Sequence, residues 1–246
     1  MSFISYFCKQ KVSKMKHIVV LTGAGISAES GLSTFRDNNG LWTKVNAEEL
    51  ASIQGYHKDR VKVLAFYNER RKNLLNVQPN HAHKFLAELE KEYKVSIITQ
   101  NVDDLHERAG SKYVLHLHGE LRKVTGSNNP NDSRCIREMP LDQPISIGDK
   151  AADGSQLRPF IVLFGESVPN MTEAKRICKE ADIFVIIGTS LVVYPAATLI
   201  ESVPWKIPCY IIDPGDFYEQ DLYGFEHIKT TAVAGVDILK ERLTAL

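Results

Sequence analysis

Side chains suited to proton transfer and hydrogen bonding follow two short apolar runs of this sequence. Gln100, Asn101 and Asp103 come just after the run at residues 95–99, and His118 comes directly after the run at residues 114–117. Because an imidazole gains or loses a proton near neutral pH, His118 is a candidate general acid or base. A single histidine at such a place can equally be a hydrogen-bonded packing residue, and both readings stay open at this point.

Glycine-containing segments follow two other apolar runs and are typical of phosphate binding. Gly23, Gly25 and Ala28 form the pattern G-x-G-x-x-A, the alanine form of the dinucleotide fingerprint. The glycines permit positive φ angles and close backbone approach, and the first N–H groups of the following helix can bind an anion. Residues 188–190, Gly-Thr-Ser, repeat this arrangement after the run at 183–187. Each segment alone also fits a turn or a helix cap without a ligand.

Composition limits the classes of protein that fit. The 246 residues include 30 basic and 30 acidic side chains, so the bulk charge favours neither a nucleic acid nor a membrane as an obligate partner. The four cysteines contain no C-x-x-C pair, which argues against a disulfide framework and a cysteine zinc site. No apolar segment is long enough to span a bilayer. We expect a soluble, cytoplasmic protein.

The apolar runs and the segments between them predict an α/β fold. Runs at residues 18–21, 95–99, 114–117, 160–164, 183–187 and 209–212 are apolar without alternation, which is typical of central parallel strands covered on both faces. Residues 80–92, 171–181 and 236–246 have helical patterns. An open parallel sheet of this kind binds ligands at the carboxyl ends of its strands.

Two segments interrupt this order and predict a smaller second lobe. After the glycines, the next strong strand begins only near Val95, whereas a dehydrogenase would place it within about 20 residues. Residues 42–77 are mostly helical in pattern, and residues 125–157 are rich in Gly, Pro, Asn, Asp and Ser. We expect a single domain over 1–246, with a large lobe at about 15–37, 79–124 and 158–246. The small lobe would cover about 38–78 and 125–157, with a cleft between the lobes.

Five ordered motifs give the chain a family resemblance. They are GAGISAESGLSTFR at 23–36, TQNVDDLH at 99–106, HGEL at 118–121, FGE at 164–166 and GTSLVVYPAA at 188–197. Together they resemble the sirtuins, which are NAD-dependent protein lysine deacylases. The resemblance implies a Rossmann-type lobe that binds NAD+ as co-substrate, and a cleft that receives the acylated lysine of a substrate protein.

The resemblance also implies roles for individual residues. His118 matches the general base, Phe35 covers the nicotinamide site and Arg36 contacts the pyrophosphate. The products would be free lysine, nicotinamide and an O-acyl-ADP-ribose. The cofactor-binding residues implied are Gly23, Ala24, Gly25, Ala28, Phe35, Arg36, Gln100, Asn101, Asp103, Gly188, Thr189, Ser190, Asp213 and Ala232. The substrate-binding residues implied are Tyr67, Arg70, Val162, Phe164, Gly165 and Glu166.

One face of the helix predicted within residues 42–77 concerns the acyl group of the substrate lysine. At 100° per residue, Val63, Phe66, Tyr67, Arg70 and Leu74 share a face, so a cation lies on an apolar stripe. Arg70 can snorkel or pair with a carboxylate. Sirtuins that prefer succinyl- or malonyl-lysine resemble this chain in a Tyr-x-x-Arg, and a guanidinium can bind a distal carboxylate in two places. The resemblance therefore implies a preference for succinyl- or malonyl-lysine over acetyl-lysine, with Tyr67 and Arg70 in the acyl channel.

The chain departs from the family pattern at two places, and three alternative functions stay open. The paired cysteines that usually bind zinc after the HGEL motif are missing and Cys135 stands alone, so no zinc is predicted. Ile211 replaces the usual asparagine two residues before Asp213, which makes the adenine end less certain. A deacetylase without acidic-acyl preference, a protein ADP-ribosyltransferase and a non-catalytic NAD sensor are the alternatives.

Overall fold

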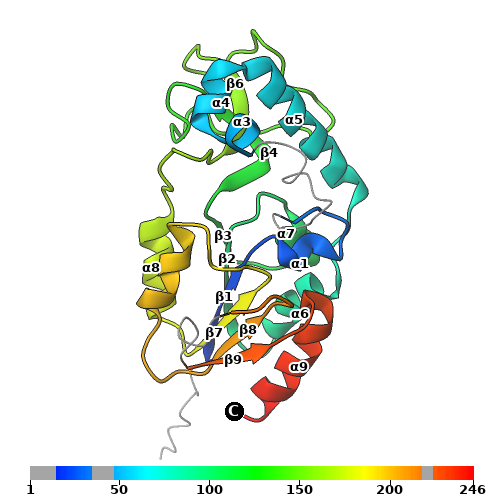
Figure 1. Ribbon diagram of the computed structural model, residues 1–246, viewed down its shortest axis with the longest axis vertical. Helices are drawn as coiled ribbons and strands as arrows, with labels where there is room; N and C mark the ends of the chain where they lie inside the picture. Colours follow the sequence, from blue (N-terminus) through cyan, green and yellow to red (C-terminus); the bar gives the residue numbers. More distant parts are fainter. Residues whose placement is uncertain (1–14, 35–46, 218–223) are drawn as a thin grey trace, which may run out of the picture.

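The computed structural model describes residues 15–34, 47–217 and 224–246, and a six-stranded parallel sheet forms its larger part (Figure 1). The strand order is β3-β2-β1-β7-β8-β9, and all neighbours are parallel. Counted along the chain within this sheet, the order is 3-2-1-4-5-6, which is that of the Rossmann fold. The strands are β1 (His17–Thr22), β2 (Lys94–Thr99), β3 (Val114–His116), β7 (Ile183–Ile187), β8 (Cys209–Ile212) and β9 (Phe225–Ile228).

Helices cover both faces of this sheet, as the unbroken apolar runs predict. In β1, Ile18 and Val20 pack in one apolar cluster with α6 (His81–Leu89) and α9 (Ala232–Thr244). Val19 and Leu21 point the other way, into a cluster with α8 (Met171–Lys179) and the 3-10 helix η2 (Ala196–Ser202). The expected helices are therefore confirmed, although α9 begins at Ala232 rather than at residue 236.

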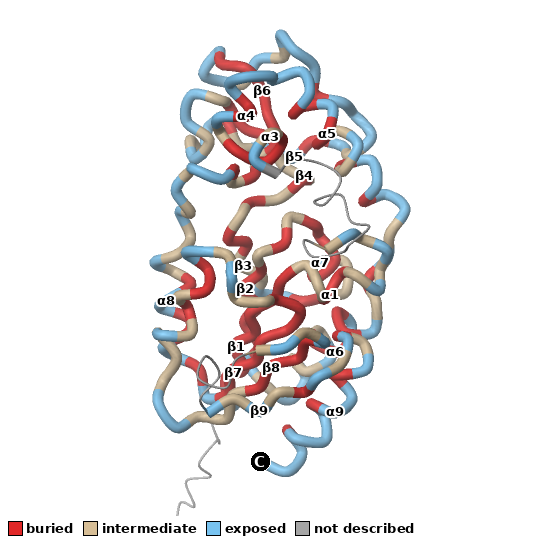
Figure 2. Tube along the Cα trace, viewed as in Figure 1, coloured by how far each residue is buried: buried red, intermediate tan, exposed pale blue. Residues whose placement is uncertain are grey.

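In the residues that the structure describes, the smaller lobe combines four helical segments with an antiparallel sheet. The helical segments are α3 (Ala47–Ala51), α4 (Ile53–Lys58), α5 (Arg60–Asn73) and the 3-10 helix η1 (Leu74–Asn76). The sheet has the order β5-β4-β6, formed by β4 (Gly119–Gly126), β5 (Arg137–Glu138) and β6 (Leu157–Ile161). Figure 2 shows that both lobes have buried interiors, and the apolar interior of the smaller lobe includes Leu64, Val124 and Leu163.

The apolar run at 160–164 was expected in the parallel sheet, and this expectation is wrong. The residues of this run that are in a strand belong to β6, which pairs antiparallel with β4. An unbroken apolar run reports burial but not the partner strand, so it could not distinguish the two sheets. The lobe bounds expected at 124/125 and 157/158 consequently pass through β4 and β6, and the small sheet includes residues on both sides of each bound.

Two short helices follow ends of the parallel strands: α1 (Gly25–Ala28) after β1, and α7 (Leu105–Ala109) after β2. The chain enters the small lobe twice, once between α1 and α6 and once between β3 and α8. In the described part of the chain, no helix is both long enough and apolar enough to cross a lipid bilayer.

Candidate active site

A cavity of about 910 Å³ lies between the lobes at the carboxyl ends of the parallel strands. This is the place where an open α/β sheet binds its ligand, beside the point where strand order reverses between β1 and β7. Phe35 and Arg36 lie outside the described residues. Every other predicted site residue lines the cavity: Gly23, Ala24, Gly25, Ala28, Tyr67, Arg70, Gln100, Asn101, Asp103, His118, Val162, Phe164, Gly165, Glu166, Gly188, Thr189, Ser190, Asp213 and Ala232.

Of the two reasons expected for the glycines after β1, close backbone approach is confirmed and positive φ is not. A Cβ atom on Gly23 would lie 2.6 Å from the Thr189 Cβ, and one on Gly25 would lie 2.6 Å from the Gly188 Cα. Neither Gly23 nor Gly25 has a positive φ, so that expectation is wrong; Gly188 has a φ of 65°. The two loops at the switch point therefore pack backbone against backbone.

The same packing uses N–H groups that were expected to bind an anion. The Gly23 N–H donates to the Ile187 carbonyl at 3.0 Å, and the Gly25 N–H donates to the Gly188 carbonyl at 2.9 Å. Both donors are thus engaged within the protein. A phosphate at this edge has to be bound by other cavity groups, among which the Thr189 and Ser190 hydroxyls are available by position.

His118 has the geometry of a neutral base. Its Nδ1 lies 2.9 Å from the Gln100 carbonyl oxygen, which can only accept a hydrogen bond, so Nδ1 carries the proton. Burial lowers the pKa of His118, although the hydrogen bond to Gln100 acts in the opposite direction. Near neutral pH the ring is therefore uncharged, and the Nε2 lone pair can accept a proton.

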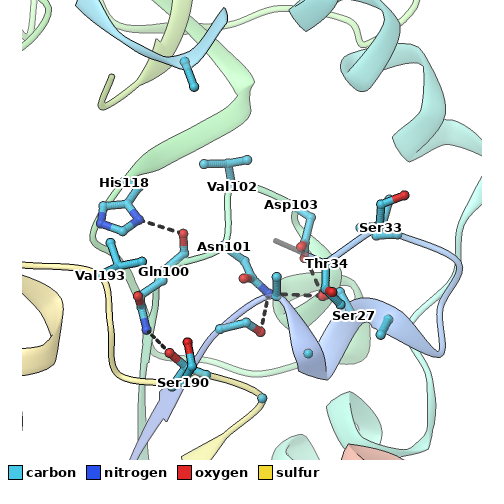
Figure 3. A pocket seen from close by; sticks show the side chains of 18 of the residues that line it. Ser27, Ser33, Thr34, Gln100, Asn101, Val102, Asp103, His118, Ser190 and Val193 are labelled. Carbon is cyan, nitrogen blue, oxygen red and sulfur yellow. Dashed lines mark hydrogen bonds between the residues drawn. The ribbon is translucent and has the colours of Figure 1, made fainter. Parts of the chain in front are cut away.

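A hydrogen-bonded network fixes the polar side chains that follow β2 (Figure 3). The Asn101 amide donates to the Gly23 carbonyl and to the Ser27 hydroxyl, each at 3.1 Å. Ser27 in turn donates to the Asp103 carboxylate at 3.1 Å. Gln100 donates to the Thr189 hydroxyl at 3.0 Å, which connects this loop to the end of β7. Strand ends far apart in the sequence therefore share one network.

Ser27 is a cavity residue that the sequence reasoning missed. It lies inside the glycine pattern, at a variable position of G-x-G-x-x-A, so the pattern gave no reason to select it. In the structure it is buried and connects Asn101 to Asp103. Burial raises the pKa of Asp103, while hydrogen bonds from the Leu105 N–H and from Ser27 oppose this rise.

The far end of the cavity contains the tyrosine and arginine of α5. Tyr67 is buried on the apolar face of α5, and burial raises its pKa to about 12, so the phenol keeps its proton. Burial lowers the pKa of the Arg70 guanidinium, while the nearby Tyr67 and Asp103 act to raise it. The guanidinium carbon also lies 5.7 Å from the centre of the Phe66 ring. The predicted stripe is confirmed, and its cation faces the cavity.

The Glu166 side chain has an internal partner. Arg158 donates to its two carboxylate oxygens at 2.7 and 2.9 Å, and the Leu163 N–H donates to it at 2.8 Å. The Val162 N–H donates to the His118 carbonyl at 2.9 Å, which joins this cavity wall to the histidine. Glu166 therefore stabilises the wall that ends at Phe164, whose exposed fraction is 46%.

At the opposite end, Asp213 is buried after β8 and accepts from the Gly215 N–H at 2.8 Å. Ala232, at the start of α9, lies on the same part of the cavity wall. Within the ranges that the structure describes, no three His, Cys, Asp or Glu side chains gather as metal ligands would. The absence of zinc stays a prediction.

Comparison with known proteins places this geometry in a family. The family model described as "Sir2 family" matches residues 23–195. A protein of Bacteroides thetaiotaomicron named NAD-dependent protein deacylase is 54% identical over 230 residues, which cover 93% of this chain and 98% of that protein. The crystal structure of a Sir2 homologue bound to NAD superposes with a TM-score of 0.80 at 40% identity, covering 94% of this chain and 91% of that one. A complex of Sir2, a p53 peptide and NAD+ gives a TM-score of 0.72 at 29% identity, with 94% and 95% coverage. The chain belongs to the Sir2 family.

Proposed function

We propose that the protein is an NAD-dependent protein lysine deacylase that transfers the acyl group of a modified lysine to ADP-ribose and releases nicotinamide. The observation that carries this proposal is the neutral His118, whose Nε2 is free to accept a proton in a cavity that Asn101 and Asp103 also line. The cavity suits a dinucleotide because it lies at the Rossmann switch point and its wall includes side-chain amides and hydroxyls. Membership of the Sir2 family supports the same activity.

In this proposal, the acyl oxygen of the modified lysine would attack the ribose carbon of NAD+ as the bond from that carbon to nicotinamide breaks. His118 then accepts a ribose hydroxyl proton at Nε2, because its Nδ1 proton is held by the Gln100 carbonyl. Asn101 and Asp103 orient the ribose and the carboxamide, and Thr189 and Ser190 bind the phosphates or the second ribose. Asp213 and Ala232 would bind the adenosine end. The roles of Phe35 and Arg36 at the nicotinamide and the pyrophosphate belong to the proposal as well.

Nicotinamide release in the presence of acyl-lysine peptides tests the activity. The purified protein is expected to release nicotinamide only when both NAD+ and an acylated peptide are present, and His118→Ala is expected to lose at least about 100-fold in rate while remaining folded. Full activity of His118→Ala would refute the mechanism. Transfer of labelled ADP-ribose to protein without deacylation would identify an ADP-ribosyltransferase. Absence of any reaction would favour the third alternative, a non-catalytic NAD sensor.

We further propose a preference for acyl groups that end in a carboxylate, such as succinyl and malonyl. The support is the pair of α5 side chains at the cavity wall: a protonated phenol and a guanidinium, one helical turn apart on a buried face. Two guanidinium N–H groups and one phenol can together hold a carboxylate.

Matched peptides test this preference. Arg70→Met keeps the length and apolar contacts of the side chain and removes its charge, so it is expected to lower kcat/KM for succinyl-lysine by about 100-fold and for acetyl-lysine by less than about 3-fold. Tyr67→Phe removes only the phenol hydroxyl and is expected to lower kcat/KM for succinyl-lysine by less than Arg70→Met does. An equal loss on both peptides would show that Arg70 supports the fold and does not select the acyl group.

A further inference from the structure

Two histidines on the same segment make parallel contacts with the loop that follows β2. The His118 Nδ1 lies 2.9 Å from the Gln100 carbonyl oxygen, and the His116 Nδ1 lies 3.0 Å from the Asn101 carbonyl oxygen. The carbonyls of Gln100 and Asn101, which are adjacent in this loop, thus each accept a hydrogen bond from one of these histidines. Because side chains alternate along an extended segment, residues two apart share a face.

The two rings differ at the other nitrogen. The His116 Nε2 lies 2.8 Å from the Glu107 carboxylate on α7, whereas the His118 Nε2 faces the cavity. A carbonyl and a carboxylate can only accept hydrogen bonds, so both nitrogens of His116 must donate. A ring with two N–H groups is an imidazolium. The geometry therefore makes His116 a cation and leaves His118 uncharged.

The electrostatics of the surroundings agree with this geometry. Burial alone would lower the pKa of His116, but the hydrogen bond and charge of Glu107 outweigh it, and the pKa is raised. Burial would raise the pKa of Glu107, but its contacts with His116 outweigh this and the pKa is lowered. His116 is only 7% exposed but the Glu107 side chain is 37% exposed, so solvent reaches one side of the pair and screens it in part.

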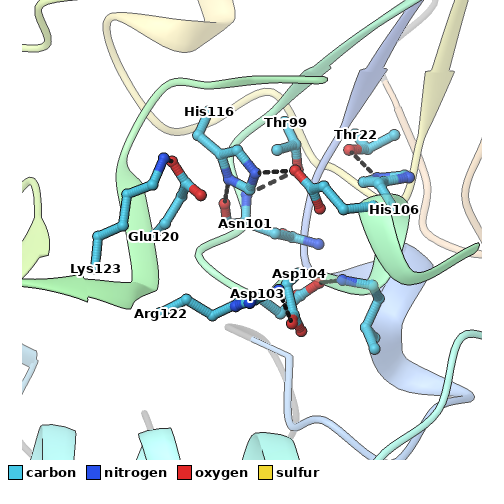
Figure 4. A network of polar contacts seen from close by, with 12 residues as sticks. Thr22, Thr99, Asn101, Asp103, Asp104, His106, His116, Glu120, Arg122 and Lys123 are labelled. Atoms are coloured by element: carbon cyan, nitrogen blue, oxygen red, sulfur yellow. Dashed lines mark hydrogen bonds and ion pairs between the residues drawn. The ribbon is translucent and has the colours of Figure 1, made fainter. Parts of the chain in front are cut away.

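Other charged groups around His116 come from three elements (Figure 4). Glu120 on β4 favours the cation and is itself paired with Lys123 at 2.5 Å. His106 on α7 is held neutral, since burial takes its pKa well below the ordinary value. From the loop after β2, Asp103 interacts with His116, and Asp104 pairs with Arg108 and Arg122. Among the described residues, the main influences on the pKa of His116 include no cation.

We propose that Glu107 keeps His116 as an imidazolium, and that this imidazolium is a positioning residue that fixes the Gln100–Asn101 backbone beneath the base His118. The proposal rests on the function proposed above. Neither His116 nor Glu107 is among the described residues that line the cavity, so the pair acts through the loop.

The consequence for the site follows from the contacts of that loop. When the Asn101 carbonyl is held, the Asn101 amide keeps its bonds to Gly23 and Ser27. The preceding Gln100 carbonyl then stays in place to hold the Nδ1 proton of His118, which leaves the His118 Nε2 as the proton acceptor. Charge-assisted hydrogen bonds of this type are stronger than neutral ones, so the imidazolium suits the task.

Nitrogen-15 NMR of the full-length protein reads the charge states directly. At pH 8 we expect protons on both ring nitrogens of His116 and a single proton, on Nδ1, in His118. Spectra of His116→Asn and His118→Asn assign the signals. In Glu107→Gln, where the amide can donate to Nε2, His116 is expected to become neutral with its proton on Nδ1. A wild-type His116 that titrates like an ordinary histidine, near a pKa of about 6.5, would overturn the proposal.

Kinetics separate positioning from a merely structural role. His116→Leu removes both donors and is expected to lower kcat by about 10- to 100-fold, with the KM for NAD+ changed less than about 3-fold. His116→Asn places an amide donor near the former Nδ1 and is expected to recover most of kcat. The His118 signals of His116→Leu should also lose the single Nδ1-protonated form.

The outcomes distinguish this inference from the proposed function. Unchanged kcat in a folded His116→Leu would refute the positioning role while leaving the deacylase proposal intact. Absence of all deacylation by the wild type would refute the proposed function, whereas the NMR result on His116 would still decide the charge state. If His116→Leu does not fold, the wild-type and Glu107→Gln spectra decide the charge state, and His116→Ala tests the positioning role: an unchanged kcat and an unchanged His118 tautomer in a folded His116→Ala would refute it.

Discussion

The two lobes are stabilised by different kinds of interaction. In the large lobe the central strand β1 carries Ile18, Val19, Val20 and Leu21, all with no exposed surface, and apolar helices cover both faces. The small lobe also has an apolar cluster. Its largest fully buried side chains, however, include two arginines, Arg71 and Arg158, which are 0% and 1% exposed.

Each buried arginine connects a helix or strand of the small lobe to other segments of the chain. Arg71 on α5 donates to the carbonyls of Leu121, Gln143, Met139 and Pro140 at 2.7–3.1 Å. It therefore joins α5 to β4 and to the 139–143 segment. The bidentate pair of Arg158 with Glu166 similarly joins β6 to the cavity wall. Apolar burial stabilises both lobes, and in the small lobe hydrogen-bonded buried cations add to it.

The strongest test of this contrast is Arg71→Met. The substitution leaves four carbonyls without their donor, those of Leu121 and Met139 in buried positions, and a buried unsatisfied polar group is costly, so we expect a loss of about 4 kcal/mol in the free energy that keeps the small lobe folded. Hydrogen exchange should show lost protection in β4 and the 139–143 segment, with β1 unchanged. A uniform loss of protection across both lobes would contradict this contrast between the lobes.

A smaller loss is expected for Leu86→Ala in α6. Leu86 is fully buried against the large sheet, so truncation removes apolar contact and creates a cavity, at a cost of about 3 kcal/mol in the free energy of unfolding. Chemical denaturation measures the effect. Leu89→Ala, at the partly buried edge of the same helix, is the matched control and should cost clearly less. Equal costs would indicate that burial does not set stability here.

Acid should act on the large lobe through His83. Burial lowers its pKa to about 4, whereas an unfolded histidine titrates near 6.5. The unfolded chain therefore binds more protons between these values, so the stabilisation is present above pH 6.5 and is lost as the pH falls towards 4. Between pH 7.5 and 5 we expect a loss of about 2 kcal/mol, measured by urea denaturation.

His83→Gln isolates this contribution, because other groups titrate in the same range. The variant should be less stable than the wild type at pH 7.5, and its stability should fall less steeply between pH 7.5 and 5. Parallel pH profiles for the two proteins would assign the acid sensitivity to other residues.

The smallest effect is expected at the surface of the small lobe. Lys62 on α5 pairs with Glu49 on α3 at 2.6 Å, but both side chains are at least 36% exposed. Exposed pairs of this kind contribute little, so Lys62→Ala should change the free energy of unfolding by less than about 1 kcal/mol. A loss comparable with that of Arg71→Met would show that surface charge, rather than the buried guanidinium, supports this lobe.

The sequence predicted the large lobe and most of the cavity because both depend on local patterns. Continuous apolar runs identify strands covered on two faces, and the carboxyl ends of parallel strands meet at one edge of the sheet. Polar residues directly after those runs, such as Asn101, His118 and Thr189, therefore come together without further information. Five of the six runs expected in the parallel sheet are strands of that sheet.

Only the tertiary structure decided which distant groups become partners. Arg71 binds the Leu121 carbonyl 50 residues away, and Ser27 meets Asp103 76 residues away. The pairing of β6 with β4, the packing of Gly25 against Gly188, and the contact of His116 with the Asn101 carbonyl also depend on the folded arrangement. Periodicity reports how far a residue is buried, but a hydrogen bond depends on where two chain segments meet. That position is set by the packing of the whole molecule.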